Sequence, residues 1–467
     1  MTYDYDVIVI GAGGAGMVAA LSAREEGANV LLLEAGERAG GSTALSGGVY
    51  YAAGTSVQRA CGIENDSPDA MFLYYMTLNQ HKVEPSLVRR LCDDAPDGLE
   101  WLISLGVRFS AENLYASGVE GIARGHRAEE FGEEIASVLE GHVSRKGIDL
   151  LVRTRASGLI MQDGNVRGVR IGDNLVTAPA VVITTGGMGN NREMLARHYP
   201  DAMAHAEHSW YVGSQYCRGD GIRLGESAGA SLAGHNRGLL MATPGFARDF
   251  EVVLPEWLVY VNRDGRRFIK ETTEYPVVAG VIKEQLNSDC FAVFDEDARL
   301  HAEREGPRPL PSWAPDTLAD MAKRGRIFKA DTIEQLGELA GIRSSTLATT
   351  VRQYNEACAK GMDEVFFKSK NGLRALTQAP FYAVRMTPSI IVVTGFGLRI
   401  NADAQVLNDA DEAVAGLFSA GETTGSVFGE RYIGSGNSIS NSIVFGRIAG
   451  RNAARRAAAE KGTANHE

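Results

Sequence analysis

The strongest constraint on the fold lies in residues 5–34. The apolar segment YDVIVI is followed by GAGGAG, by a stretch of helical pattern, and by NVLLLE, which ends at Glu34. This order predicts a strand, a glycine-rich turn, a helix and a second strand, which is the βαβ unit that binds the adenosine diphosphate end of a dinucleotide. Gly11 permits the tight turn, Gly13 lets backbone amides approach a pyrophosphate, and Gly16 lets the helix pack closely. Glu34 is placed to accept hydrogen bonds from the ribose.

The segment after Glu34 indicates which dinucleotide is bound. It reads AGERAGGSTALSGG, and its glycines would let the backbone run against a second, bulky part of the cofactor. A flavin explains this better than a nicotinamide does, and a flexible glycine loop is the alternative. No second GxGxxG unit with its own acid follows, so no separate pyridine-nucleotide domain is expected. The sequence therefore predicts FAD as the cofactor.

Charge and composition argue against several other classes of function. The 467 residues carry a formal net charge of −11, which disfavours nucleic acids and anionic membranes as partners, because both require a basic face. The apolar runs are too short to span a bilayer and no leader peptide precedes the first strand, so we expect a cytoplasmic protein without membrane insertion. Five widely spaced cysteines without a CxxC pair predict free thiols. His205 and His208 stand in an HxxH spacing without a complete ligand set, so no metal is expected.

The remaining sequence indicates an inserted domain. TAPAVVITTGG reads as a strand of the amino-terminal sheet. From about Gly238 the pattern changes to a hairpin-like segment, LVYVNRDGRRFI, and to a charged helical section at 331–360 that opens with a capping pattern. The chain then returns through GLFSAGETTGS to a glycine-rich loop and an alanine-rich helix. We therefore expect an α/β fold in which residues 1–237 and 395–467 form a Rossmann-like FAD-binding domain and residues 238–394 form an α+β capping domain.

Six motifs extend over almost the whole chain in the order GAGGAG, GGSTALSGG, VVITTGG, NRDGRRFIKE, SAGETTGS and VFGRIAG. In these motifs the chain resembles the fumarate reductase/succinate dehydrogenase flavoprotein superfamily. The resemblance implies an FAD domain from both ends of the chain, a mobile capping domain, and a substrate at the flavin under the cap. It also implies that Glu34 holds the adenosine ribose, that Ala156 touches the adenine region, and that Glu422 holds the ribityl chain. Residues 436–439 would lie against the pyrimidine edge of the flavin. The cofactor-binding residues implied by these motifs are Gly11, Gly13, Gly14, Ala15, Gly16, Glu34, Ala35, Gly40, Gly41, Ser42, Ser46, Gly47, Gly48, Ala156, Thr185, Gly186, Gly421, Glu422, Asn437, Ser438 and Ile439.

The chain departs from the fumarate-type pattern at the positions that attach the cofactor covalently and at those that bind the substrate. Respiratory members attach FAD through a histidine, and this chain has Gly41 at that place, so noncovalent FAD is expected. Tyr275 stands where the family has its acid-base arginine, and Ile391 and Val392 stand where it has a pair of histidines. The family's NRLGGN is replaced by RYIGSGN. A dicarboxylate requires charge-assisted hydrogen bonds from such groups, so fumarate and succinate are not expected as substrates.

The YIGSG segment is similar to the YxGxG loop of 3-ketosteroid Δ1-dehydrogenases, which desaturate a ring ketone. The resemblance implies that the Tyr432 hydroxyl and the Gly436 amide polarise the substrate carbonyl. It further implies that Tyr275 removes the α proton and that Tyr115 assists it. The expected reaction is the oxidation of a 3-ketosteroid or smaller cyclic ketone, with hydride transfer from the β carbon to FAD.

Two alternatives remain open from the sequence. One is an ene-reductase that acts on an unsaturated acid or an enone, and the other is a flavin-containing redox sensor without turnover. Arg431 or Arg248 could hold a carboxylate on the substrate. The expected partners are a small ketone and an external electron acceptor, such as oxygen, a quinone or another carrier. The sequence does not indicate the oligomeric state.

Overall fold

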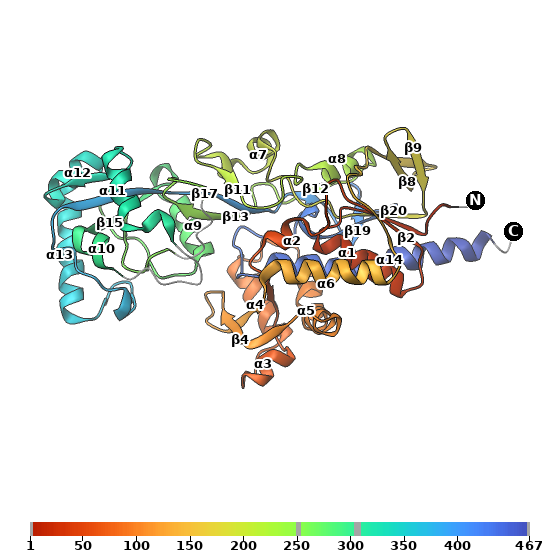
Figure 1. Ribbon diagram of the computed structural model, residues 1–467, viewed down its shortest axis with the longest axis horizontal. Coiled ribbons are helices and arrows are strands. Elements are labelled where there is room, and N and C mark those ends of the chain that lie inside the picture. The colour runs from red at the N-terminus through yellow and green to blue at the C-terminus, as the bar shows by residue number, and fades with distance from the viewer. Residues whose placement is uncertain (1–2, 249–253, 303–309, 465–467) are drawn as a thin grey trace. The chain divides into compact units, whose positions relative to one another are not determined.

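The computed structural model describes residues 3–248, 254–302 and 310–464 (Figure 1). The chain divides into two compact units. Unit 1 consists of Met1–Pro200, Tyr211–Leu239 and Val392–Glu467, and unit 2 consists of Asp201–Trp210 and Leu240–Ile391. Most of unit 2 coincides with the insertion expected at 238–394. The difference is that Asp201–Trp210, which we expect from the sequence in the first domain, belongs to unit 2.

Unit 1 is built around a six-stranded sheet. Its strands in spatial order are β19 (Gln405–Leu407), β20 (Ala413–Ser419), β10 (Ala180–Ile183), β1 (Val7–Ile10), β2 (Val30–Leu33) and β6 (Asp149–Leu151). All neighbouring strands are parallel except β19 and β20, which are antiparallel. Every residue of β1, β2 and β10 is buried, as expected of a parallel sheet that is covered on both faces. The prediction that TAPAVVITTGG contributes a strand to the amino-terminal sheet is confirmed.

The helices α1 (Gly14–Glu25) and α14 (Asn437–Ala464) pack against each other on this sheet (Figure 1). Two glycines of α14 allow the close approach. A Cβ atom on Gly450 would lie 2.1 Å from the carbonyl oxygen of Ala19, and one on Gly446 would lie 2.7 Å from that of Ala15. The first and the last helix of unit 1 therefore meet backbone to backbone.

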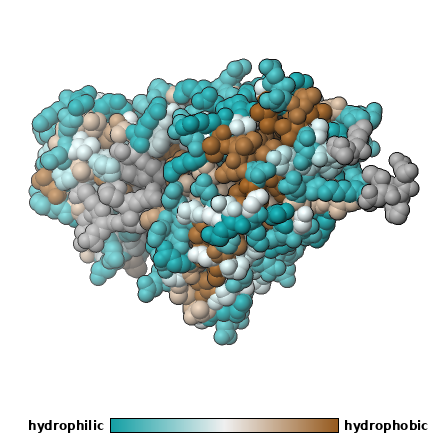
Figure 2. Space-filling model, turned by 45° about the vertical axis from the view of Figure 1, so that its right-hand side comes forward, coloured by the Kyte–Doolittle hydropathy of each residue, from teal (hydrophilic) through white to brown (hydrophobic). Residues whose placement is uncertain are grey.

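Smaller layers complete unit 1. The strands β3, β5 and β4 form one antiparallel sheet and β7, β8 and β9 form another. Exposed apolar side chains include Leu151, Met161 and Leu175, and hydrophobic areas are visible among the hydrophilic ones in Figure 2. The remaining helices and strands of unit 1 are α2 (Gly41–Leu45), β3 (Val49–Tyr51), α3 (Ser56–Ala60), α4 (Pro68–Leu78), α5 (Pro85–Leu105), β4 (Phe109–Ala116), β5 (Ala123–Ala128), α6 (Phe131–Arg145), β7 (Gly158–Gln162), β8 (Asn165–Ile171), β9 (Asn174–Thr177), α7 (Arg192–His198), α8 (Asp220–Ser227), β12 (Leu232–Ala233) and β18 (Gly397–Leu398).

Unit 2 combines an antiparallel sheet with helices, as the expected α+β insertion requires. Its core is rich in large aromatic side chains, among them Trp257, Phe294, Trp313 and Tyr382. The long strand β17 pairs with β11, β13, β15 and β16, and β15 pairs with β14. These strands are β11 (Trp210–Tyr211), β13 (Gly238–Thr243), β14 (Val259–Val261), β15 (Cys290–Asp295), β16 (Phe328–Ala330) and β17 (Phe381–Thr394). The helices are α9 (Tyr275–Lys283), α10 (Glu296–His301), α11 (Pro315–Lys323), α12 (Ile333–Ala340) and α13 (Ser344–Lys360).

Three segments of unit 2 can be compared with the sequence-based expectation. The charged section at 331–360 is helical, as expected, and it consists of two helices because Gly341 adopts φ +68° and ends α12. The helix is capped one residue later than the expected pattern at 331–334, since the Thr332 side chain accepts a hydrogen bond from Gln335 N. LVYVNRDGRRFI is hairpin-like, as expected: Val261 and Arg267 form an antiparallel bridge, and Asn262 N donates to the Arg266 carbonyl over 3.0 Å. Its first half, β14, also pairs with β15.

The segment at 201–210 is held in unit 2 by polar contacts. Lys283 Nζ lies 2.5 Å from Asp201 Oδ2, and His205 Nε2 donates a hydrogen bond to the Ser288 carbonyl over 3.0 Å. His208 lies 3.7 Å from Glu207. Within residues 3–248, 254–302 and 310–464 no group of three or more side chains could hold a metal ion. No helix in this described part of the chain is long and apolar enough to cross a membrane.

Candidate functional site

The turn between β1 and α1 has the geometry that a bound pyrophosphate requires. Gly11 has φ +101°, and a Cβ there would lie 2.5 Å from the Thr184 carbonyl oxygen. A Cβ on Gly16 would lie only 1.7 Å from the Gly11 carbonyl oxygen, so any side chain there would push the helix off the turn. Helix α1 begins after Gly13, which has no side chain to cap it, and Gly14 N donates to Thr43 Oγ1 over 3.2 Å. The positive end of the helix dipole and the N–H groups after Gly14 are suited to a phosphate.

Glu34 is fixed at the end of β2 by two backbone donors. Its Oε2 accepts a hydrogen bond from Ala12 N over 2.9 Å, and its Oε1 accepts one from Gly36 N over 2.6 Å. Each carboxylate oxygen has a second lone pair that can accept from a ribose hydroxyl. The acid predicted to bind the ribose is thus locked in place by the same turn that would bind the pyrophosphate.

The second glycine-rich stretch forms a short helix and a turn next to the first. Gly40 N donates to the Ala12 carbonyl over 2.8 Å, and Gly41, at φ +51°, begins α2. Ser46 Oγ donates to the Thr43 carbonyl and accepts from Gly48 N. The strand, the two turns and α2 therefore bring the predicted residues of 11–16 and 40–48 together.

The carboxyl ends of β10 and β20 bring two further predicted segments together. Thr423 Oγ1 donates to the Gly186 carbonyl over 3.1 Å. The Glu422 carboxylate accepts hydrogen bonds from Thr394 N and Oγ1 at 2.7 and 2.8 Å, and from the Tyr211 hydroxyl at 3.3 Å. Burial raises the pKa of Glu422, and the hydrogen bonds from Thr394 oppose this shift. Glu422 is thus oriented by neighbours that the sequence does not point to.

Cys217 is a second residue here that sequence reasoning missed. Its Sγ lies 3.5 Å from Ser42 Oγ, and a Cβ on Gly186 would lie 2.6 Å from it. Burial raises the pKa of this thiol to about 11, so it is a neutral, unreactive group near neutral pH. All five cysteines are free thiols.

The loop before α14, residues 431–437, holds the predicted carbonyl-binding groups. The Tyr432 hydroxyl accepts a hydrogen bond from Ser438 N over 2.8 Å. Gly436 has φ +104°, and a Cβ there would lie 2.8 Å from Tyr51 N. Asn437 is fully buried; its Nδ2 donates to the Tyr75 hydroxyl, whereas its Oδ1 has no partner within the described residues. We refer to residues 431–437 as the α14 entry loop.

The α14 entry loop is held by side chains from the amino-terminal half of unit 1. The Tyr74 hydroxyl donates to the Ile433 carbonyl over 2.8 Å. Ser117 Oγ donates to the Ser435 carbonyl over 3.1 Å. Ser440 Oγ is within hydrogen-bond distance of the Gly436 carbonyl, at 3.2 Å. Because several backbone groups of the loop are fixed, its donors are preorganised.

A buried charged cluster lies beneath the same loop. Arg124 and Asp66 form a bidentate ion pair with distances of 2.6 and 2.8 Å, and both side chains are almost fully buried. Glu120 Oε1 accepts a short hydrogen bond from the Tyr51 hydroxyl and lies 3.6 Å from Arg124 Nη1. Burial and the charge of Glu120 raise the pKa of Tyr51. Sequence reasoning missed this cluster, because its members come from separate elements and share no motif.

The other predicted catalytic residues lie on separate elements. Tyr115 is on β4 and is 39% exposed. Its strand leads directly to Ser117, which contacts the α14 entry loop, so Tyr115 and Tyr432 belong to neighbouring segments of unit 1. Tyr275 is the first residue of α9 in unit 2. Arg248 is exposed in unit 2 and Arg431 is half-buried in unit 1.

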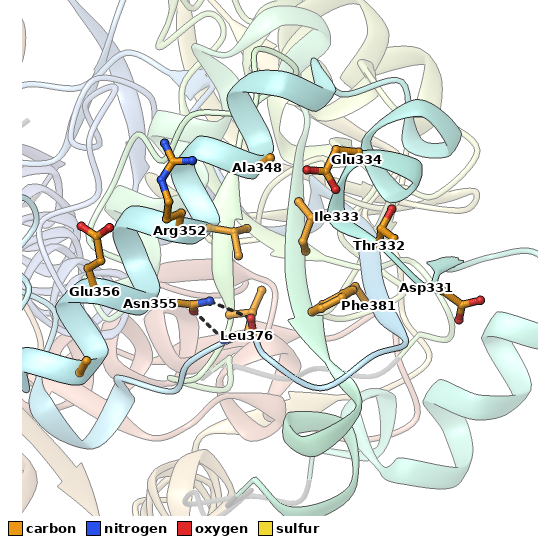
Figure 3. Close-up of a pocket in the computed structure, with 12 residues that line it drawn as sticks. Asp331, Thr332, Ile333, Glu334, Ala348, Arg352, Asn355, Glu356, Leu376 and Phe381 are labelled. Carbon is orange, nitrogen blue, oxygen red and sulfur yellow. Dashed lines mark hydrogen bonds between the residues drawn. The ribbon is translucent and has the colours of Figure 1, made fainter.

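A surface groove of about 610 Å³ lies in unit 2 between α12, α13 and β17. Figure 3 shows Arg352, Asn355 and Glu356 on its α13 side and Ile333 on its α12 side. Asn355 binds both backbone groups of Leu376 over 2.8 Å. None of the predicted site residues lines this groove.

The residues of unit 1 fit FAD as a whole. The glycine turn and the start of α1 suit the pyrophosphate, and Glu34 suits the ribose. The unpaired, buried Oδ1 of Asn437 lies at the start of α14, where a polar ring edge would satisfy it. Ala156, which is predicted to touch the adenine region, is buried between β6 and β7.

Comparisons with known proteins identify the family. Residues 6–439 match the family described as FAD binding domain. The chain is 34% identical to a probable fumarate reductase of Shewanella frigidimarina, over 97% of this chain and 75% of that protein. It is 31% identical to a urocanate reductase of Eggerthella lenta, over 97% of this chain and 75% of that protein. It is 24% identical to a 3-oxosteroid 1-dehydrogenase of Mycolicibacterium smegmatis, over 98% of both chains.

Solved structures give the same result. The open conformation of a flavocytochrome c3 fumarate reductase is similar with a TM-score of 0.68 and 32% identity, over 97% of this chain and 78% of that chain. A 3-ketosteroid Δ1-dehydrogenase of Sterolibacterium denitrificans shares the fold, with a TM-score of 0.79 and 20% identity over 97% and 99% of the two chains. This chain therefore belongs to the FAD-binding family of the fumarate reductase/succinate dehydrogenase flavoprotein superfamily, and it is an FAD-dependent oxidoreductase.

Proposed function

We propose that this oxidoreductase introduces a carbon–carbon double bond next to the carbonyl of a 3-ketosteroid or a smaller cyclic ketone. The observation that carries the proposal is the position of the Tyr432 hydroxyl in the α14 entry loop. It accepts the Ser438 N–H over 2.8 Å, which ties the hydroxyl to the start of α14, two residues from Gly436. The Gly436 N–H in the same loop has no acceptor within the described residues and supplies a second donor. Two fixed donors are what an enolate oxygen requires.

In the proposed reaction the chain handles the carbonyl and the proton. Tyr432 and Gly436 stabilise the negative charge that develops on the substrate oxygen. Tyr275 takes the α proton, and Tyr115 assists, because a tyrosine with a pKa of about 10 is a weak base on its own. FAD, when bound, would supply the two-electron acceptor for the hydride of the β carbon. An external acceptor such as oxygen or a quinone would be needed to remove these electrons.

The proposed FAD site consists of the residues given above, with FAD bound noncovalently because Gly41 offers no side chain for a covalent link. Glu34 holds the adenosine ribose and Glu422 holds the ribityl chain. Residues 436–439 contact the pyrimidine edge of the flavin. Denaturation in acid should release all the flavin into the supernatant; flavin that stays with the precipitated protein would contradict this assignment.

A second candidate is the reduction of an unsaturated acid or enone. It is favoured by the names of the relatives that share 31% to 34% identity with this chain, a urocanate reductase and a probable fumarate reductase. In that case Arg431, in the α14 entry loop, would hold a substrate carboxylate. The absence of the family's paired histidines at Ile391 and Val392 argues against a dicarboxylate.

Anaerobic half-reactions separate the two candidates. Oxidised enzyme is mixed with androst-4-ene-3,17-dione and with a series of cyclic ketones, and the flavin absorbance is followed. Ketone dehydrogenation predicts bleaching by at least one ketone. Enzyme reduced with dithionite is mixed with fumarate, urocanate and enones, and rapid reoxidation by an acid without bleaching by any ketone would overturn the first proposal.

Substitutions test the role of the loop. Tyr432→Phe removes the donated hydrogen and should lower kcat/KM by about 10²- to 10³-fold, as does loss of one oxyanion donor. FAD content should not change. Tyr5→Phe is the matched control, because the Tyr5 hydroxyl only binds Asp149 at the surface. Equal activity of both variants would contradict the role of Tyr432. Absence of turnover in the unmodified protein with every ketone, acid and enone tested would favour a redox sensor.

A further inference from the structure

We propose that Glu120 sets the reduction potential of the flavin by placing an uncompensated negative charge beneath the α14 entry loop. The inference goes beyond the proposed reaction, because it concerns the flavin and holds for either direction of turnover. It rests on the proposed position of the flavin edge against residues 436–439.

The charge balance of the cluster is the first argument. Two carboxylates, Asp66 and Glu120, face one guanidinium, that of Arg124. Asp66 occupies Arg124 with two short hydrogen bonds, whereas Glu120 has only a 3.6 Å approach to Nη1 and no hydrogen bond to it. Oε2 of Glu120 is buried and borders the same small space as the neutral Tyr74 hydroxyl, so no second cation among the described residues faces it there. The cluster therefore retains one negative charge that its own cation does not neutralise.

The position of Glu120 is the second argument. A Cβ placed on Gly118 would lie 2.2 Å from Glu120 Oε2 and 2.6 Å from the Ile433 carbonyl oxygen, so both atoms border the same small space. Tyr51, which donates to Glu120, has its ring against Gly434. The carboxylate thus lies directly under the backbone of the α14 entry loop.

The effect of Glu120 on neighbouring groups is the third argument. Its charge, together with burial, raises the pKa of both Tyr51 and Tyr74, so both remain neutral donors. A charge that acts on two buried hydroxyls in a poorly screened interior also acts on a cofactor at the other side of the loop. Reduced flavin carries more negative charge than oxidised flavin, so a carboxylate there disfavours reduction. The start of α14 has the opposite effect, because the N-terminal end of a helix stabilises negative charge.

The test is the midpoint potential of the FAD-loaded protein. Glu120→Gln retains the shape and an acceptor for Tyr51 but removes the charge. It should raise the equilibrium constant for flavin reduction by on the order of tenfold, which is about 30 mV for a two-electron couple. Tyr51→Phe is the matched control: it removes the hydrogen bond, retains the charge, and should not raise the potential. An unchanged potential in Glu120→Gln would overturn the proposal.

If the potential is unchanged in Glu120→Gln, a third variant shows whether the role of Glu120 or the position of the flavin edge is wrong. Ser438→Asp adds a negative charge in the first turn of α14, a position that tolerates acidic residues. It should lower the potential if the flavin edge lies there. A shift with Ser438→Asp and none with Glu120→Gln refutes the role of Glu120 alone. No shift with either variant refutes the flavin position as well. The flavin absorbance spectrum of each variant confirms that it still binds FAD.

Discussion

The contact between α1 and α14 can be tested with one methyl group. In Gly450→Ala the added Cβ would lie 2.1 Å from the carbonyl oxygen of Ala19 and 2.8 Å from the carbonyl carbon. Both distances are shorter than a non-bonded contact allows. Both atoms belong to backbone in the middle of a helix and cannot turn away. The helices must therefore separate by more than 1 Å, roughly, to reach ordinary contact. Overpacking of this kind costs about 1–3 kcal/mol.

Helix propensity works against this cost, so a control is needed. Alanine is favoured over glycine within a helix by about 1 kcal/mol. Gly141→Ala on α6 gains the same amount, and its Cβ would meet only the flexible end of Arg145 at 3.2 Å. The difference between the two variants therefore isolates the steric cost, about 1–3 kcal/mol. Thermal unfolding followed by flavin fluorescence at one fixed FAD concentration measures it. If Gly450→Ala melts as high as Gly141→Ala, the helices are not in backbone contact.

Three further outcomes follow from the structure. Burial lowers the pKa of His126 from its ordinary 6.5 to about 4, so the folded state favours the neutral ring. The contribution of His126 to the free energy of unfolding is therefore complete above pH 6.5 and decreases by up to about 3 kcal/mol as the pH falls towards 4. His126→Gln should reduce this decrease, and an unchanged dependence of the unfolding free energy on pH would contradict the lowered pKa. Arg267→Met leaves Glu271 and Asp363 buried without their guanidinium partner and should destabilise unit 2 by about 3–5 kcal/mol in denaturant titrations. Arg38→Met, at an exposed ion pair with Glu133, is the control and should lower the free energy of unfolding by less than about 1 kcal/mol. Equal losses in the two variants would contradict this prediction. Glu34→Gln should weaken FAD binding about ten- to a hundredfold, because a hydrogen bond to a charged group contributes about 1.5–3 kcal/mol; equilibrium titration with FAD checks this, and a wild-type Kd would count against a ribose contact.

Local pattern was sufficient for the parts of the fold that depend on neighbours in sequence. The βαβ unit follows from the alternation of apolar runs and glycines, and the strand at 180–183 follows from its continuous hydrophobicity. The helical section at 331–360 was also predicted, but its division at Gly341, where the backbone turns left-handed, was not. The hairpin-like turn at 258–269 was likewise predicted, whereas the pairing of β14 with β15 depends on a distant segment of the chain.

The polar clusters could not be predicted in this way. Glu120 and Tyr51 come together only through the pairing of β3 with β5, and the α14 entry loop reaches them from the other end of the chain. Tyr211 and Thr394, which orient Glu422, likewise belong to distant segments. Such contacts have no period or spacing in sequence. A motif indicates which residue contacts the cofactor, but the neighbours that hold that residue are set by tertiary packing.

The docking of α14 onto α1 also has a consequence for how the protein is made. In the six-stranded sheet β1 pairs with β10, β10 pairs with β20, and α14 packs on the sheet beside α1. During synthesis the early strands therefore emerge from the ribosome long before their partners. Until then the apolar face of α1 and the edge of β10 stay uncovered and open to wrong pairing. Loss of a few residues from α14 should thus reduce the yield of folded protein far more than an equal loss from a surface loop, and chaperones should bind the unfinished chain.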